Sequence, residues 1–132
     1  MSKIAQLTLS LSALLLVSCS AVSQESSVCE VRASPASFLG KDLELSGLAE
    51  VHRHGTNLTD PNCPGIALAL SSPPESSQGS ASDTFFLTLS PLMAPGSTPV
   101  AVKVHGKLIE QTGLPPYTFV VASGSIQRKG GG

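Results

Sequence analysis

The apolar segment near the start of the chain most constrains the fold, because it separates an export signal from the part that folds. Residues 4–17 are apolar apart from four polar positions, and Lys3 precedes them. Fourteen residues fall short of the roughly 20 that a membrane-spanning helix needs. The segment is typical of a secretory signal peptide, so we predict that residues 1–18 are removed. The remainder has room for one domain of about 100 residues.

Two cleavage sites compete. Residues 16–19, Leu-Val-Ser-Cys, are similar to the bacterial lipobox, whose cysteine receives a lipid and becomes the first residue of the mature chain. Residues 21–23, Ala-Val-Ser, would suit an ordinary signal peptidase that cuts before Gln24. The lipobox is favoured, because a cysteine rarely falls at that position by chance. We expect a lipid on Cys19, a polar tether over residues 19–27, and a domain over residues 28–127. The tail at 128–132 is expected to be disordered.

These features predict a location at the bacterial cell envelope, lipid-anchored on the periplasmic face. Ser20, rather than an aspartate, follows Cys19 and favours the outer membrane over the inner one. Without Lys3 the chain carries 7 basic and 9 acidic residues. Nucleic-acid binding needs several phosphate-neutralising cations, so it is not expected. The predicted partners are the membrane, through the lipid, and another envelope protein.

With Cys19 assigned to the lipid, Cys29 and Cys63 remain as a pair. In an oxidising compartment such a pair predicts a disulfide. Two free thiols or a metal-binding pair are the less favoured alternatives.

Alternation of apolar and polar residues predicts most of the strands. It is clearest over residues 42–51 and 98–109, whose inward positions each include a glycine. Residues 66–70 and 117–126 are further strands, and 34–40 carry the start and stop signals of one helical turn. Residues 52–64 are predicted to form a loop or a tight hairpin, residues 71–83 a surface loop, and residues 84–93 either a strand or a short helix. Short strands with glycine bends favour a small closed or nearly closed β-barrel.

The middle of the chain carries a pattern of Gly40-Lys41, a strand with Gly47, then His54-Gly55, Asp60 and Cys63-Pro64, followed by a valine-rich strand ending at Gly106. This pattern resembles that of a group of uncharacterised bacterial secreted proteins and lipoproteins. The resemblance covers about residues 29–106. It implies a mainly β fold, a small five-stranded OB-like barrel with one disulfide, and no particular activity.

The candidate metal ligands are histidines. His52 and His54 lie two residues apart, a spacing that places both rings on one face of a strand. With Asp60 or His105 as a third ligand they would suit copper or zinc. The favoured interpretation is nevertheless a pair of solvated surface histidines beside a turn, and no cofactor is expected.

Catalytic signatures are weak. The serines do not form a Gly-x-Ser-x-Gly or Ser-x-x-Lys motif. Asp60 with His52 or His54 would supply two members of a triad, but so many serines make a chance grouping expected. The sequence therefore favours a non-enzymatic, lipid-anchored binding or structural module. A periplasmic copper or zinc binding protein is the first alternative, and a small hydrolase is the second.

Overall fold

The structure is a computed structural model that describes residues 23–52, 55–75, 77–94 and 97–127. The predicted signal peptide, Cys19 (the predicted lipidation site), His54 and the tail at 128–132 lie outside these residues.

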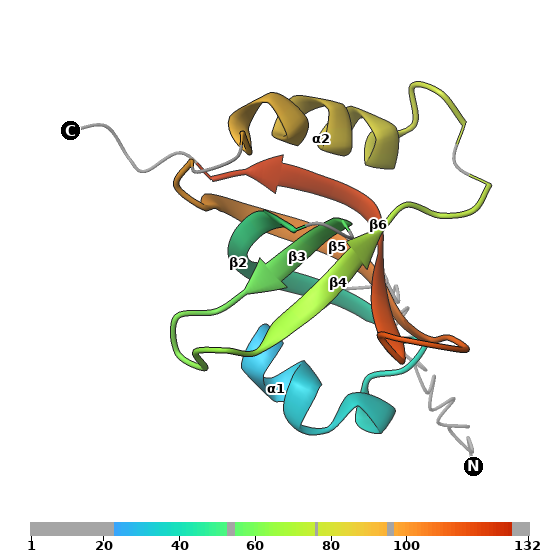
Figure 1. Cartoon of the computed structure of the whole chain (residues 1–132). Coiled ribbons are helices and arrows are strands. Elements are labelled where there is room, and N and C mark those ends of the chain that lie inside the picture. The colour runs from blue at the N-terminus through green and yellow to red at the C-terminus, as the bar shows by residue number, and fades with distance from the viewer. Residues whose placement is uncertain (1–22, 53–54, 76, 95–96, 128–132) are drawn as a thin grey trace, which may run out of the picture.

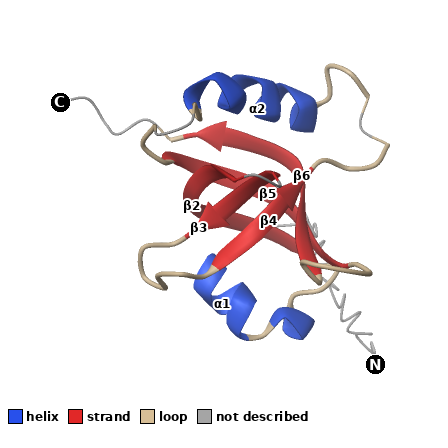
Figure 2. Ribbon diagram, in the orientation of Figure 1, coloured by secondary structure: helices blue, strands red, loops and turns tan. Residues whose placement is uncertain are grey.

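The described chain consists mainly of β-strands, with two α-helices and two 3-10 turns (Figure 2). In chain order the elements are β1 (Gln24–Ser27), α1 (Val28–Ala33), η1 (Pro35–Ser37), β2 (Asp42–His52), β3 (Gly55–Thr59), β4 (Ala67–Ser71), α2 (Ala81–Leu89), η2 (Ser90–Leu92), β5 (Val100–Glu110) and β6 (Tyr117–Ile126).

Five of the strands close into a barrel. The antiparallel pairs β2–β3 and β3–β4 continue through the parallel pair β4–β6 and the antiparallel pair β6–β5. β5 then returns to pair with β2 over residues 42–49, which closes the ring. This five-stranded order is that of an OB-like barrel. The mainly β prediction, with its barrel, its short helical turn and its single disulfide, is confirmed.

The barrel interior is filled by the predicted inward faces of the two long strands. Leu43, Leu45 and Ala49 of β2 are fully buried, as are the inward side chains of β5 at Val104 and Leu108. Val51 was expected on the same face, but it is 54% exposed. It pairs with Thr56 of β3 but lies beyond residue 49, where the pairing of β2 with β5 ends.

Part of the expected tether belongs to the sheet. Residues 24–27 form β1, which pairs in parallel with residues 43–46 of β2. From Leu48 onward, β3 pairs with the same edge of β2. Between the two lies Gly47, where an added Cβ would sit 2.6 Å from the Thr59 carbonyl oxygen. The polar side chains of β1 show no alternation, so only the backbone ladder reveals this strand.

Two segments that the sequence left open are settled in the structure. The predicted loop or tight hairpin at 52–64 contains β3, which pairs with β2 as an antiparallel hairpin. The segment at 84–93 takes the helical alternative, and α2 starts at Ala81, so the predicted 71–83 loop is wrong for its last three residues. The Ser80 hydroxyl caps α2 by accepting a hydrogen bond from the Asp83 amide, 3.1 Å away. Helix α2 covers β6, whereas α1 lies at the opposite end of the barrel (Figure 1).

Candidate functional site

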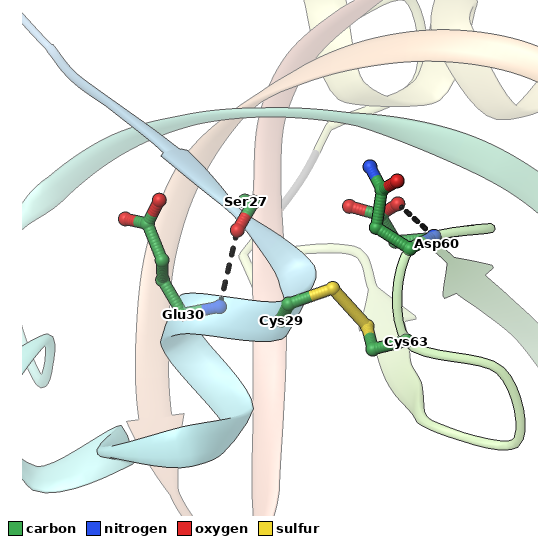
Figure 3. Close-up of a disulfide and its surroundings, with 6 residues drawn as sticks. Ser27, Cys29, Glu30, Asp60 and Cys63 are labelled. Atoms are coloured by element: carbon green, nitrogen blue, oxygen red, sulfur yellow. Dashed lines mark hydrogen bonds between the residues drawn. A yellow bond between two sulfur atoms is a disulfide. The ribbon is translucent and has the colours of Figure 1, made fainter.

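The disulfide fixes the loop that joins β3 to β4. Cys29 of α1 is bonded to Cys63 of this loop, with Cα atoms 5.8 Å apart (Figure 3). Within the loop, the Asp60 carboxylate accepts a hydrogen bond from the Asn62 amide at 2.8 Å, and the Asp60 carbonyl accepts one from the Cys63 amide at 3.1 Å. Covalent and hydrogen bonds therefore hold the Asp60 side chain in a defined place.

Beside this loop lies a surface groove of about 480 Å³, which we call the β2–β4 groove. Its floor comes from the outward positions of β2, β3 and β4, and its far wall from the disulfide-bonded loop. The lining residues are Leu48, Glu50, His52, Asn57, Thr59, Asp60, Pro61, Pro64, Gly65, Ile66 and Ala67. The register explains the floor, because Leu48 faces Thr59 and Glu50 faces Asn57 across the β2–β3 ladder.

The ionisable side chains of the groove are two carboxylates and one imidazole. Glu50 Oε2 lies 3.2 Å from His52 Nε2, and both side chains are open to solvent. Lysine and arginine are missing from the lining, as far as the described residues define it. The groove is therefore a weakly acidic surface with an apolar rim.

A second polar surface lies over the other half of β2, which we call the ion-pair face. It consists of Asp42 and Glu44 on β2 and Lys103, His105 and Lys107 on β5. Glu44 is its centre: Oε1 lies 3.1 Å from Lys103 Nζ, and Oε2 lies 2.7 Å from His105 Nε2. Hydrogen bonds from Lys103 and then from His105 lower the pKa of Glu44 below its ordinary value.

Among the described residues, the predicted metal ligands fall on two different surfaces. His52 and Asp60 line the β2–β4 groove, but His105 belongs to the ion-pair face, and His54 lies outside the described residues. His105 contacts Glu44, which is eight residues from His52, about 26 Å along the strand.

Within residues 23–52, 55–75, 77–94 and 97–127, one group of three potential ligand atoms lies within 4.8 Å of one another: Cys29, Asp60 and Cys63. Both sulfur atoms of that group are bonded to each other, so they are not thiolate ligands.

A Glu-His-Ser row does form across the sheet, and sequence reasoning missed it. Glu44 faces His105 in the β2–β5 ladder, and His105 faces Ser123 in the β5–β6 ladder. In the described part of the chain His105 has Glu44 as its side-chain hydrogen-bond partner, and Ser123 has none. Lys103 shares the same carboxylate. This arrangement is an ion-pair ladder rather than an assembled triad, in which the serine would contact the imidazole.

Another cavity, of about 630 Å³, lies between α2 and the second half of β6. Phe85 of α2 packs against Gly124, where a Cβ would come within 2.6 Å of the ring. The cavity is mostly apolar and contains no ionisable side chain among its described lining residues.

Comparison of the sequence with models of known protein families and with curated proteins gives no match. Among the described residues, no helix has the length and apolar character needed to span a membrane.

Proposed function

We propose that the chain is a non-enzymatic binding module, exported and held at the bacterial cell envelope by a lipid on Cys19, that binds another envelope protein through the β2–β4 groove. The observation that carries the proposal is the groove itself. It opens on the outer surface of the first three barrel strands, the face that OB-like barrels commonly use for ligands.

The construction of the groove supports binding by a rigid surface. Its wall is tied to α1 by the Cys29–Cys63 disulfide, and its floor is a hydrogen-bonded ladder. A surface that is ordered before binding loses little conformational entropy when a partner docks.

The composition of the groove favours a protein over an oligonucleotide or a sugar. OB-like barrels that hold bases stack them on aromatic side chains and neutralise phosphates with cations. Phenylalanine, tyrosine, lysine and arginine are all missing from the described lining. Its prolines and Ile66, which is 38% exposed, instead offer apolar contacts to another protein.

Site-specific photo-cross-linking in a bacterial host tests this proposal. A photoreactive amino acid replaces Ile66 in the groove or, as the matched control, Leu87 on the exposed face of α2. We expect one envelope protein to cross-link at position 66 and not at 87, and the purified protein to bind the purified chain. Absence of a reproducible product at position 66 would contradict the proposal.

A periplasmic copper or zinc binding protein stays the second candidate, because His52 and Asp60 line the same groove. Titration of the purified chain with Zn²⁺ and Cu²⁺, compared with a His52→Ala variant, decides it. Equal affinities would exclude His52 as a ligand.

A further inference from the structure

We infer that the partner segment that enters the β2–β4 groove is basic, with an arginine or lysine side chain directed toward Glu50 and Asp60. This inference rests on the proposed function and adds the chemistry of the partner. The carboxylates of the two polar surfaces differ in their positively charged partners.

The carboxylates of the ion-pair face are already compensated. Asp42 lies 3.9 Å from Lys107, and Glu44 lies 3.1 Å from Lys103. In contrast, neither Glu50 nor Asp60 has a lysine or arginine nitrogen within 4.0 Å in the described part of the chain. The groove therefore holds two negative charges that the described residues leave without a permanent positive partner.

The two groove carboxylates also keep oxygen atoms for a ligand. Glu50 uses Oε2 toward His52, and Asp60 uses Oδ1 to accept from the Asn62 amide. The other oxygen of each carboxylate accepts no hydrogen bond from the described residues. A guanidinium or ammonium group donates several hydrogen bonds and matches such acceptors.

The rest of the lining suits the aliphatic part of the same side chains. Pro61, Pro64 and Ile66 form an apolar rim next to Asp60. The methylene groups of arginine and lysine pack along such surfaces while the charged end reaches polar groups. The apolar rim and the two carboxylates together favour a basic protein segment over a neutral or acidic one.

Fluorescence anisotropy with a defined probe tests the inference. The probe is a labelled acetyl-Gly-Arg-Gly-Arg-Gly-amide peptide, and the control is the same peptide with citrulline, which keeps the shape of arginine without its charge. The full chain is purified in a non-ionic detergent. We expect the arginine peptide to bind at least about tenfold more tightly than the citrulline peptide, with weaker binding at high salt.

Charge-neutralising variants locate the binding. Glu50→Gln and Asp60→Asn should each lower the affinity for the arginine peptide about two- to fivefold, the range of exposed ion pairs. Asn at position 60 keeps an oxygen for the Asn62 amide, so the loop is preserved. Asp42→Asn, on the ion-pair face, is the matched control and should change nothing.

Three results would overturn the inference: no binding of the arginine peptide, equal binding of the citrulline peptide, or an equal loss in Asp42→Asn, which would mean attraction by overall charge. A different result would contradict the proposed function. If cross-linking at position 66 finds no envelope protein but the arginine peptide binds as expected, the groove takes a basic ligand of another origin. If a protein is captured at position 66 but the arginine and citrulline peptides bind equally, the proposed binding function is supported, and the partner is not recognised by its charge.

Discussion

The two halves of β2 present similar outward residues but different surfaces. In the first half, Asp42 and Glu44 face β5 and contact its lysines and His105. In the second half, Glu50 faces Asn57 of β3 and contacts the exposed ring of His52. The neighbouring strand, rather than the alternation within β2, decides whether an outward carboxylate is compensated.

The two halves are also held in different ways. The ion-pair face lies over the β2–β5–β6 ladder, the longest run of pairing in the barrel. The β2–β4 groove depends on short strands and on the Cys29–Cys63 bond, which ties its wall to α1. Variants that remove one of these supports at a time test whether the two surfaces depend on different parts of the fold.

Removing the disulfide should have the largest effect. Replacing both Cys29 and Cys63 with serine should lower the free energy of unfolding by about 3–4 kcal/mol, because the bond closes a loop of 34 residues in the unfolded chain. Urea unfolding measures the change. Amide hydrogen exchange should quicken first in residues 60–66 and least in β5 and β6. An unchanged urea midpoint would show that the bond does not support the fold.

Two glycines give the next effect: the half-buried Gly47 of β2, and the buried Gly106 of β5, which faces Leu43 in the first half of β2. At Gly106 an added Cβ would lie 1.9 Å from the Val120 carbonyl oxygen, next to the bulge in the β5–β6 ladder. At Gly47 it would lie 2.6 Å from the Thr59 carbonyl oxygen. Both contacts involve backbone, so each alanine variant should lose about 1–3 kcal/mol, with Gly106→Ala the more destabilised. The reverse order in thermal or urea unfolding would contradict this ranking.

The long strands could be predicted from the sequence, whereas helix α1 was missed. The long strands followed from strict alternation, since one face of each packs against the core at Leu43, Leu45, Val102 and Val104. Helix α1 was missed although its signal was present: Ser27 and Glu30 have capping-box spacing, and the Ser27 hydroxyl accepts from the Glu30 amide at 3.1 Å (Figure 3).

The sites were harder to predict than the strands. Several lining residues of the groove lie within residues 52–64, for which the sequence predicts only a loop or a tight hairpin. The pairing of Glu44 with Lys103 and His105 could not be inferred, because it depends on the register between strands some 60 residues apart. The same register separates His105 from His52 and divides the predicted set of metal ligands.

Glu44→Gln tests the first half of β2. The pKa of Glu44 is lowered in the folded state by its hydrogen bonds with Lys103 and His105, so its ionised form stabilises the fold above its ordinary pKa of 4.5. That contribution is lost as the pH falls through the lowered pKa. The wild type should therefore be more stable than Glu44→Gln at pH 7 by a margin that shrinks in acid. Urea midpoints measured from pH 7 to pH 3 would refute this if the margin stayed constant.

Glu50→Gln should have the smallest effect on stability. The Glu50 side chain is 34% exposed, and its side-chain partner in the described chain is the exposed His52. Losing an exposed pair of this kind should change the free energy of unfolding at pH 7 by less than about 0.5 kcal/mol. Urea unfolding beside Glu44→Gln gives the direct comparison, and an equal loss in both variants would remove the contrast between the two halves. A near-neutral result would mean that folding does not depend on the Glu50 charge, which leaves that carboxylate free to meet a positive charge on a partner.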